Sequence, residues 1–568
     1  MPSKQEVTRP IYTIDIETDP FVYGRDPQPF ACGLFDGTKF RYTWGVDCMT
    51  KMHAIVHGME PGILYAHNGG KFDFYYMMDW LANEREMLII NGRIVKADAY
   101  ILDSSEFHQL RDSFALMPFA LKKYKKERID YRCFETENRD SNKKEILNYL
   151  KKDCQYLHEL CVSFHERFGD NLTIASTSMK EFKKQYSFTC LTSREDDMLR
   201  EPFYFGGRVQ CFEKGIITPT RGEKIQAYDL NQCYPFAMSN FTHPISAPDG
   251  RQSNVIIDGS TYFLTVEGYS HGAFPTRKKD GLSFAPCAGE FHVTIHEFNA
   301  AIETGMFELH DVLRTYNFRE SSKFDKFVTK FHKLRRDAQL SNDDVGALFY
   351  KYVGNSCYGK FAQRPDDYHS YMLTDDRTNL NPKHEPDNWF PCTLIGFAGY
   401  ILWKRPSLAS KRYNVATGAS ITGAARSLLI RGIAKAKRPL YCDTDSLICE
   451  RLEGVPIDAT KIGHWKLEHT ATKMAIGGRK LYTLFSHECP SCGGRKKSPI
   501  GDCKKSEDRN DLFHDYGACK IASKGVHLNP AEILRVCQGH EVEYYKAAPT
   551  FDFKAHASKF IKRTVRMT

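Results

Sequence analysis

Two aspartates separated by one residue stand out in the C-terminal half of the sequence. Asp443 and Asp445 lie in the stretch YCDTDS at residues 441–446, with apolar residues on both sides. This pattern predicts a buried hairpin with both carboxylates on one face, because alternate side chains of an extended chain point the same way. Carboxylates this close repel each other and are retained mainly where a cation neutralises them. A solvated Asp-Thr-Asp turn is the alternative interpretation.

A third carboxylate ends another apolar segment well upstream. Asp229 lies in the stretch AYDLNQCYP at residues 227–235. If Asp229 packs beside the hairpin, three acids surround one site. Two metal ions held there would activate an attacking oxygen and stabilise a leaving oxygen, so the spacing predicts a phosphoryl-transfer site.

The N-terminal part of the sequence carries a second set of acids. Residues 11–18, IYTIDIET, alternate so that isoleucines occupy one face of a predicted strand and Asp15 and Glu17 the other. Taken alone, this segment fits an exposed strand edge better than a catalytic site. The interpretation changes only because further acids follow.

Those further acids come from a bend and a helix. Asp73 follows the glycine-rich stretch at residues 67–72, and residues 145–161 predict an amphipathic helix. Tyr149 and Asp153 are four residues apart and therefore share a face of that helix. Together with the strand, this gives four acids and one tyrosine that could meet at a second site.

The composition is that of a mildly basic globular protein. The 568 residues include 79 Lys and Arg against 70 Asp and Glu, and 42% are hydrophobic. The length allows several domains, and the basic excess fits a polyanionic partner. The sequence lacks an apolar run of about eighteen residues and begins without an apolar signal segment, which predicts a soluble, intracellular protein without membrane contact.

The 18 cysteines are scattered through apparent strands and helices, so reduced thiols are expected. One cluster is different, because Cys489 and Cys492 form a CxxC pair that Cys503 and Cys519 follow. These four could hold a structural Zn²⁺ in a tetrahedral site. Free thiols in a loop are the alternative, since the second pair is widely split.

Three motifs in the correct order resemble those of family B DNA polymerases. The segment from Asp229 to Pro235 is similar to motif A, residues 355–360 (NSCYGK) to motif B, and residues 441–446 to motif C. The resemblance implies attack of a 3′-OH, or first of a protein hydroxyl, on the α-phosphate of a dNTP. Asp229 and Asp445 would then hold two Mg²⁺, with Mn²⁺ as an expected substitute, and Asp443 would support them.

The same resemblance assigns residues to nucleotide and DNA. Tyr234 becomes the steric gate that excludes a 2′-OH, although Gln232 and Cys233 depart from the usual Ser-Leu of motif A. Arg335 and Arg336 are weaker triphosphate candidates. The expected nucleotide-binding residues are Tyr234, Lys351, Asn355 and Tyr358. The expected DNA-binding residues are Tyr204, Gly206 and Gly207 of a YxGG motif followed by Arg208, then Gly359, and Lys480 and Tyr482 of a KxY motif.

The N-terminal acids resemble the three Exo motifs of proofreading 3′–5′ exonucleases. Asp15 and Glu17 match the first motif, Asp73 the second, and Tyr149 and Asp153 the third. In that family the acids hold two metal ions, and the tyrosine orients the attacking water, so an active exonuclease is expected. The residues implied to grip the frayed 3′ end are Thr18, His67, Asn68, Phe72 and Ser113.

Residues 18–21 (TDPF), 27–30 (PQPF) and 65–74 (YAHNGGKFDF) resemble those of the small protein-primed polymerases of tectiviruses, and the likeness extends over most of the chain. This implies an α/β multidomain fold, with an RNase H-like exonuclease domain over residues 1–185 and a polymerase domain over 186–568. The expected polymerase parts are a palm with motif A near 229 and motif C near 443, a first insertion at 236–330, fingers at 331–361, a second insertion at 362–410 and a thumb at 525–568.

The resemblance also implies partners and place. The expected partners are duplex primer-template and single-stranded 3′ ends, dNTPs, and a separately encoded terminal protein as primer. The protein would act as a monomer or as a heterodimer with that primer, in the cytoplasm of a bacterial host. Two alternatives remain: a polymerase that extends ordinary nucleic-acid primers, and a nuclease or DNA-binding factor without synthesis.

Overall fold

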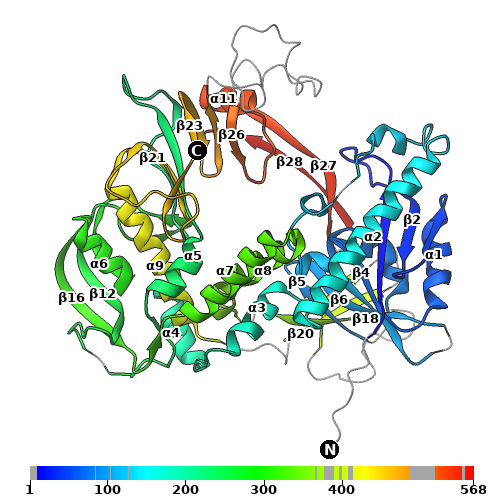
Figure 1. The fold of residues 1–568 in the computed structure, drawn as a ribbon, viewed down its shortest axis with the longest axis horizontal. Coiled ribbons are helices and arrows are strands. Elements are labelled where there is room, and N and C mark those ends of the chain that lie inside the picture. Colours follow the sequence, from blue (N-terminus) through cyan, green and yellow to red (C-terminus); the bar gives the residue numbers. More distant parts are fainter. Residues whose placement is uncertain are drawn as a thin grey trace, which may run out of the picture.

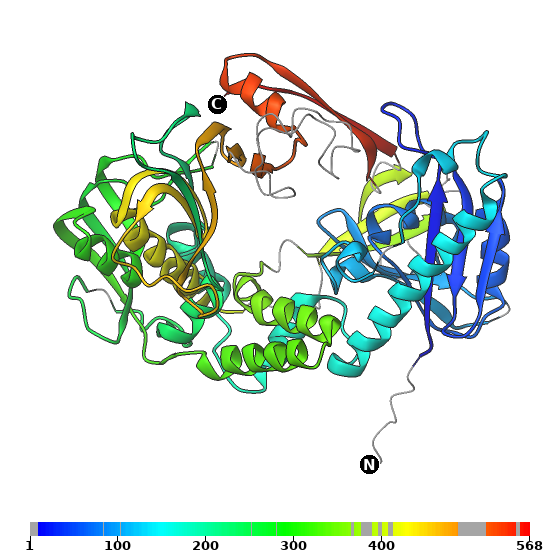
Figure 2. The same ribbon diagram turned by 45° about the horizontal axis from the view of Figure 1, so that its top comes forward.

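The computed structural model describes residues 9–567, except residues 83–84, 103, 126, 252, 280, 365–367, 376–388, 396–399, 407–412, 487–517 and 553–556. Its ribbon has a ring-like outline (Figures 1 and 2). The N-terminal strands lie on one side and the middle of the chain on the other. Two helices, α7 (Asp325–Leu340) and α8 (Asp344–Phe361), lie between them, and a C-terminal hairpin of β27 (Val542–Asp552) and β28 (Ala557–Val565) spans the opposite gap.

The N-terminal side is built on one mixed sheet of ten strands. β1 pairs in parallel with β4 and antiparallel with β2, so side chains on β1 lie inside the sheet, two strands from its β3 edge. In spatial order the strands are β19 (Phe390–Ile395), β20 (Tyr400–Pro406), β18 (His369–Asp375), β5 (Glu86–Ile90), β6 (Arg93–Tyr100), β7 (Phe107–Asp112), β4 (Ile63–Ala66), β1 (Ile11–Thr18), β2 (Pro29–Phe35) and β3 (Phe40–Trp44).

Helices cover both faces of this sheet. The long amphipathic helix α2 (Lys143–Phe168) packs on β1 and β2, and α1 (Cys48–His57) packs on β2 and β3. Gly33 of β2 permits the close approach of α2, because a Cβ there would lie 2.7 Å from Leu150. Short 3-10 helices make up the connections: η1 (Gly69–Lys71), η2 (Asp73–Trp80), η3 (Ser113–Ala115), η4 (Leu121–Lys123) and η5 (Tyr131–Phe134).

Three strands of this sheet come from far along the sequence. β18, β19 and β20 lie within the expected second insertion, and β18 pairs antiparallel with β5, with His369 opposite Ile89. These strands follow α8 directly in the chain. The insertion therefore returns to the N-terminal unit and extends its sheet.

The other side of the ring is built on a five-stranded sheet, called here the central sheet. Helix α9 (Val415–Ala434) is buried against it, and α5 (Cys233–Asn240) packs on α9. In spatial order its strands are β23 (Trp465–Ala471), β10 (Ile225–Leu230), β22 (Ser446–Leu452), β21 (Ala436–Asp443) and β8 (Val209–Cys211).

A separate small module lies outside the central sheet. Its three strands are ordered β15 (Cys287–Thr294), β12 (Thr261–Ser270) and β16 (Phe307–Asn317), and α6 (Ile295–Glu303) packs between them and α9. It falls within the expected first insertion. Two small pairs accompany it: β13 (Thr276–Lys278) with β14 (Gly281–Ser283), and β11 (His243–Pro244) with β17 (Ser321–Ser322).

The helical bridge joins the two sides through a shared core. α7 and α8 pack on each other, while α3 (Ile174–Lys183) packs on α8 and α4 (Ser193–Phe203) on α9. One apolar cluster runs from Phe164 of α2 through Phe349 of α8 to Leu429 of α9. Apolar packing therefore continues from one side of the ring to the other.

The C-terminal part is a second antiparallel sheet with one helix. Its strands are ordered β26 (Ala518–Ser523), β25 (Leu481–Phe485), β24 (Lys473–Gly478) and β9 (Gly215–Ile217), and α11 (Pro530–Cys537) packs on β24. The β27–β28 hairpin extends from this unit. Within the described residues, no helix is both long and apolar enough to cross a membrane.

Candidate active sites

The hairpin predicted around the paired aspartates is present. β21 ends at Asp443 and β22 begins at Ser446, and these residues lie opposite each other. Thr444 adopts a left-handed conformation (φ 63°), and the backbone N–H of Asp445 donates to the carbonyl of Asp443 at 2.7 Å. This tight turn places both acids at one end of the central sheet.

Asp229 lies beside that turn. It pairs with Ser446 across β10 and β22, and the backbone N–H of Leu230 donates to the carbonyl of Asp445 at 2.7 Å. Burial raises the pKa of Asp229 to about 7 and that of Asp445 to about 6, and the neighbouring carboxylates add to both shifts. The two acids are therefore crowded in partly desolvated surroundings, where a cation would stabilise their ionised forms.

One further acid near this pair was not found from the sequence. Glu468 of β23 raises the pKa of both Asp229 and Asp445. Its nearest cations are Lys520 (3.2 Å) and Lys466 (3.7 Å). Glu468 lies near Asp229 and Asp445 only because β10 pairs with β23, a pairing that the sequence does not predict.

The third acid of the hairpin is paired with the expected KxY segment. Lys480 forms an ion pair with the Asp443 carboxylate through its Nζ atom. Its own backbone N–H donates to the Tyr441 hydroxyl (3.0 Å), and the Tyr441 and Tyr482 rings lie 4.7 Å apart. Lys480 and Tyr482 thus lie directly beside the hairpin, as a primer-terminus role would require.

The expected YxGG segment contacts the same turn. The carbonyl of Arg208 accepts a hydrogen bond from the Thr444 backbone at 2.7 Å, and Val209 pairs with Asp443. A Cβ on Gly207 would lie 2.5 Å from the Thr444 hydroxyl, so only glycine fits there without movement. At Gly206, by contrast, a Cβ would meet no atom of the described residues within 4 Å.

Arg208 has a different position from the phosphate contact that its charge suggested. Its side chain is 2% exposed, its guanidinium donates to Gln210, and it lies 4.6 Å from the centre of the Phe284 ring. Burial lowers the pKa of Arg208. It packs behind the hairpin and does not reach a surface that DNA could touch.

A buried ion pair holds the YxGG segment from behind. Arg426 of α9 and Glu297 of α6 are 2% and 1% exposed, with Nε and Oε1 2.5 Å apart. The Arg426 Nη1 atom also donates to the carbonyls of Phe205 (2.6 Å) and Gly206 (2.9 Å). In the sequence, the sign of this buried ion pair is a charged residue, Arg426, among the small and apolar residues of α9.

Two expected nucleotide-binding tyrosines are stacked. The rings of Tyr234 on α5 and Tyr358 on α8 lie 4.0 Å apart and are nearly parallel, at 6°. Burial raises the pKa of Tyr358, and the nearby Tyr204 adds to the shift. Gly359, the next residue of α8, is exposed. These side chains form one aromatic surface next to Asp229 and Asp445.

A group of cations lies on the helical bridge. Burial lowers the pKa of Lys351, and nearby Arg335 and Lys123 lower it further, whereas Asp229 opposes the shift. Asn355 lies one turn further along α8 and is half-buried. Lys123 comes from the N-terminal unit, and its Nζ atom lies 3.4 Å from the Tyr352 hydroxyl. Nothing in the sequence predicts that Lys123 lies here, because its contact with Tyr352 joins two units far apart in the chain.

The second acid set comes from three elements of the N-terminal unit. Asp15 and Glu17 lie on β1, Asp73 begins η2, and Tyr149 and Asp153 lie on α2. Glu17, Asp73 and Asp153 are 8%, 3% and 5% exposed. α2 packs directly on β1, and the Asp73 carboxylate accepts a hydrogen bond from the Ile16 backbone of β1, so these acids lie around a common interior.

The electrostatics support that grouping. Burial raises the pKa of Asp73 to about 7, and the Asp112 carboxylate adds to the shift. Burial also raises the pKa of Tyr149, helped first by Asp153 and then by Glu17. Burial raises the pKa of the Cys154 thiol, and Asp15, Asp153 and Glu17 add to the shift. Burial likewise raises the pKa of the Cys32 thiol, and Asp73 and Asp15 both add to that shift. The four acids and the tyrosine therefore interact within one site.

Polar residues expected to grip a 3′ end form two connected groups. The His67 Nδ1 atom lies 3.0 Å from the Ser113 hydroxyl, and its Nε2 atom lies 2.9 Å from the Phe119 carbonyl. The Asn68 amide oxygen accepts a hydrogen bond from Arg93 at 2.9 Å, and Arg93 also pairs with Asp112. The hydroxyl of Thr18 donates to the carbonyl of Asp19.

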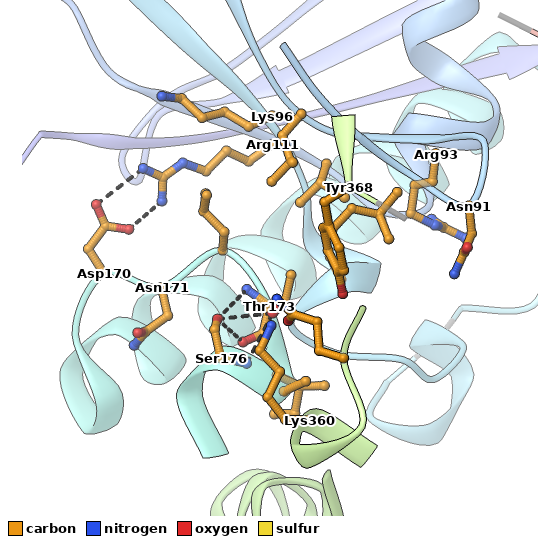
Figure 3. A pocket seen from close by; sticks show the side chains of 18 of the residues that line it. Asn91, Arg93, Lys96, Arg111, Asp170, Asn171, Thr173, Ser176, Lys360 and Tyr368 are labelled. Carbon is orange, nitrogen blue, oxygen red and sulfur yellow. Dashed lines mark hydrogen bonds and ion pairs between the residues drawn. The ribbon is translucent and has the colours of Figure 1, made fainter. Parts of the chain in front are cut away.

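A cationic cavity of about 1050 Å³ lies between the N-terminal sheet, the start of α3 and the end of α8 (Figure 3). Asp170 is its single acidic lining residue, and its carboxylate pairs with Arg111. Tyr368 and Tyr413 add aromatic rings, and Lys183 lies 4.9 Å from the Tyr413 ring centre. The lining cations are Lys71, Arg93, Lys96, Arg111, Lys183 and Lys360.

The expected zinc site is largely outside the described residues. Cys489, Cys492 and Cys503 fall there, while Cys519 lies on β26 with its Sγ atom 3.6 Å from the Leu484 carbonyl. All cysteines among the described residues are free thiols. Also among the described residues, no three His, Cys, Asp or Glu side chains are arranged to hold a metal ion by themselves.

A family model described as DNA polymerase type B, organellar and viral, matches residues 123–446. The DNA-directed DNA polymerase of Enterobacteria phage PRD1 is 40% identical over 100% of this chain and 99% of its own. The DNA polymerase of Bacillus phage Nf is 26% identical over 74% of this chain and 77% of its own. A probable DNA polymerase of Agaricus bitorquis is 23% identical over 74% of this chain and 64% of its own.

Solved structures of Phi29 DNA polymerase have the same fold. The complex with primer-template DNA has a TM-score of 0.70 at 18% identity and covers 99% of this chain and 100% of that chain. The complex with DNA and incoming nucleotide has a TM-score of 0.68 at the same identity and coverage. The predicted fold class is thereby confirmed: an RNase H-like exonuclease domain joined to a palm, fingers and thumb.

Proposed function

The chain belongs to the organellar and viral type B DNA polymerases, and we propose that this DNA-directed DNA polymerase also proofreads its product and begins synthesis on a protein. The observation that carries the assignment of its synthetic site is the meeting of Asp229 and Asp445 at one end of the central sheet. The stacked rings of Tyr234 and Tyr358 lie next to these acids.

Asp229 and Asp445 would hold the divalent metal ions of synthesis. Burial and, after it, the neighbouring carboxylates raise their pKa values, so ionising both acids is unfavourable. A bound cation would offset this unfavourable free energy. Mg²⁺ suits a site with so few protein ligands, because it keeps several waters and takes substrate phosphates as further ligands. When bound, Mg²⁺ or Mn²⁺ supplies the charge that activates the attacking oxygen and stabilises the leaving one.

The remaining residues orient the reactants. With a nucleotide bound, the Tyr234 ring would lie beneath the sugar and leave no room for a 2′-OH, and Tyr358, whose ring stacks on that of Tyr234, would contact the nascent base pair. Lys351 and Arg335 bind the triphosphate, and Asn355 lies on the same side of α8. The pair of Lys480 with Asp443 positions the primer terminus, beside Tyr482.

The N-terminal site is proposed to remove mispaired 3′ ends. Asp15, Glu17, Asp73 and Asp153 would hold two metal ions, and Tyr149 would orient the attacking water. The groups around His67 and Asn68 would bind the frayed strand, with Thr18, Phe72 and Ser113 beside them. This proposal rests on four acids and one tyrosine that interact within one buried site.

The cationic cavity is proposed to bind single-stranded DNA. Six cations around Tyr368 and Tyr413 combine phosphate neutralisation with aromatic stacking, the two features of single-strand sites. Lys183→Glu should weaken binding of a single-stranded oligonucleotide by about tenfold at low salt, with a smaller effect at high salt. Equal binding by the variant and the wild type would contradict the proposal.

Protein priming is supported by the two insertions. The β15–β12–β16 module with α6 stands apart from the central sheet, and β18, β19 and β20 return to the N-terminal sheet. Segments of this length inside a compact polymerase generally have a function of their own. A terminal protein would supply the first hydroxyl, and the module is its proposed contact.

The test uses purified protein, Mg²⁺ and each labelled dNTP in turn, with and without the candidate terminal protein of the same genome. A nucleotide that becomes covalently attached to that protein is the expected result. No attachment, together with efficient extension of an annealed primer, would establish the conventionally primed alternative. A mispaired labelled primer in the same buffer tests 3′ trimming separately.

A further inference from the structure

A short segment of the exonuclease domain is packed firmly against the helical bridge. Residues 116–124, which include η4, bury Leu116 and Phe119 in the apolar core that also holds Phe349 of α8. The Phe119 ring is 3% exposed and stacks on the ring of Tyr352 of α8 at 5.4 Å and 24°. Figure 1 shows α8 beside α2 of the same domain. The apolar packing therefore fixes this segment relative to α8.

Lys123 extends from this segment toward α8. Its Nζ atom lies 3.4 Å from the Tyr352 hydroxyl, which is longer than a strong hydrogen bond. Lys123 forms no ion pair with an acid of the described chain, whereas Lys125, two residues further on, pairs with Glu159 at 3.0 Å. The described part of the protein thus orients the Lys123 ammonium group but does not neutralise it.

Two further cations lie close to Lys123. Lys351 directly precedes Tyr352 on α8, and Arg335 comes from α7, which packs on α8. Partial burial lowers the pKa of Lys351, and the nearby Arg335 and Lys123 add to the shift. Neither Lys351 nor Arg335 is ion-paired to an acid among the described residues. Like charges that gather without a counter-ion favour a bound anion.

The position of Asp229 indicates which anion fits. The nearby Asp229 carboxylate opposes the shift in the pKa of Lys351, so the cations lie next to the proposed metal ligands of synthesis. Metal ions held there take substrate phosphates as further ligands. A triphosphate concentrates its charges in one short group that can meet several cations at once, whereas a DNA strand carries one charge per nucleotide. The cations therefore suit the triphosphate better than a strand.

We propose that Lys123 is a nucleotide-binding residue of the polymerase site, supplied by the exonuclease domain. Its ammonium group binds the outer phosphates of the incoming dNTP together with Lys351 and Arg335, and Tyr352 holds it in place. The exonuclease domain thereby completes the substrate site of the other domain. This inference deepens the proposed function, because it rests on Lys351 as a triphosphate ligand, but it depends on neither proofreading nor protein priming.

The test measures dNTP binding without chemistry. The full-length protein is bound to a primer-template whose primer ends in a dideoxynucleotide, and the Kd of the next correct dNTP is measured with Mg²⁺. Lys123→Ala should raise that Kd about tenfold, as expected when one charge-assisted hydrogen bond is lost. With an extendable primer, KM for the dNTP should rise by a similar factor while kcat stays near wild type.

Matched variants separate this effect from a general loss of charge or fold. Lys122→Ala removes the adjacent exposed lysine of η4 and should bind dNTP like the wild type. Lys123→Arg should recover most of the affinity. Tyr352→Phe removes the hydroxyl beside Lys123 but keeps the ring on Phe119, and should raise the Kd about twofold. An equal loss in Lys122→Ala and Lys123→Ala would overturn the proposal.

Inorganic pyrophosphate tests phosphate recognition without a base or a sugar. The concentration that halves primer extension should be about fivefold higher for Lys123→Ala than for the wild type. All four dNTPs should lose affinity alike, because the triphosphate is common to them. Equal pyrophosphate inhibition of both proteins would contradict the proposal. Weaker binding of primer-template by Lys123→Ala, with an unchanged Kd for dNTP, would assign Lys123 to DNA instead.

Lys351→Ala distinguishes failure of this inference from failure of the proposed nucleotide site. If Lys351→Ala raises the Kd of the dNTP and Lys123→Ala does not, Lys123 is no ligand and the proposed site stands. If neither variant changes the Kd, the triphosphate site itself is misassigned. The expected result is a higher Kd in both variants, with the larger loss in Lys351→Ala.

Discussion

The two acid sites of this polymerase are built in opposite ways. In the palm, Asp443 and Asp445 sit on one tight turn and Asp229 on the adjacent strand, so the sheet register alone brings them together. In the exonuclease domain the acids come from β1, η2 and α2, and Glu17, Asp73 and Asp153 are buried while Asp15 is half-buried. The palm site is thus shallow and locally encoded, whereas the exonuclease site is enclosed and assembled by tertiary packing.

This difference fits the substrates. A palm site with two adjacent acids must be completed by the triphosphate and the primer, so it acts only when both are present. The N-terminal site groups four acids of β1, η2 and α2, and the trimming reaction proposed for it needs only a single-stranded end as substrate. If the two sites act independently, loss of one should leave the other active.

The largest effect is expected at the palm acids. Asp445→Ala removes one of the two proposed metal ligands and should reduce synthesis by at least about a thousandfold, with trimming of a mispaired primer retained. The reciprocal variant, Asp15→Ala with Glu17→Ala, should abolish trimming and leave extension intact. Primer extension and trimming assays on both proteins give the answer, and retained synthesis by Asp445→Ala would refute the assignment.

A smaller loss is expected when the partner of Asp443 is removed. Lys480→Ala leaves that carboxylate without its cation and should lower primer extension by roughly 10–100-fold, while trimming stays near wild type. Lys480→Arg keeps the charge and should recover part of the activity. Steady-state extension with varied primer concentration would show the loss mainly as weaker primer binding.

A substitution that pushes the YxGG segment against the hairpin should reduce synthesis by a still smaller factor. Gly207→Ala places a methyl group against Thr444 and should slow synthesis about tenfold by moving the turn. Gly206→Ala is the matched control, because its methyl group would meet no described atom. If the two variants lose equal activity, the effect is on DNA contact and not on the turn.

The smallest expected effect is the pH dependence of the rise in melting temperature that metal causes. The pKa values of Asp229 (about 7) and Asp445 (about 6) lie above those of an unfolded chain, so without metal the folded palm loses stability as pH rises from about 4 to about 7. Mg²⁺ should therefore raise the melting temperature by about 2 °C more at pH 8 than at pH 5. Asp229→Asn should remove most of that difference.

The sequence was informative where chemistry is local. The turn at Asp443 and Asp445, the alternating strand with Asp15 and Glu17, and the helix with Tyr149 and Asp153 all follow from spacing and periodicity, and each element is present. These signals depend on residues within one turn or one strand. Neighbouring proline, glycine or apolar residues then determine the turn, strand or helix locally, without contacts from the rest of the chain.

The sequence did not predict the side chains whose positions depend on packing between segments far apart in the chain. Glu468 approaches Asp229 only because β10 pairs with β23, and Arg426 reaches the YxGG segment only because α9 lies behind it. Arg208 suggested a phosphate contact by charge but is buried by the strands around it. Position in three dimensions, not residue type, decides each of these cases.

The strands β18, β19 and β20 have a consequence for how the protein could be divided. They complete the exonuclease sheet although they are encoded after the fingers, so β5 would become a bare edge if the chain were cut at residue 185. Unprotected edges template aggregation. The exonuclease domain is therefore not a detachable module: a truncated domain would need a replacement for these strands before it could remain in solution.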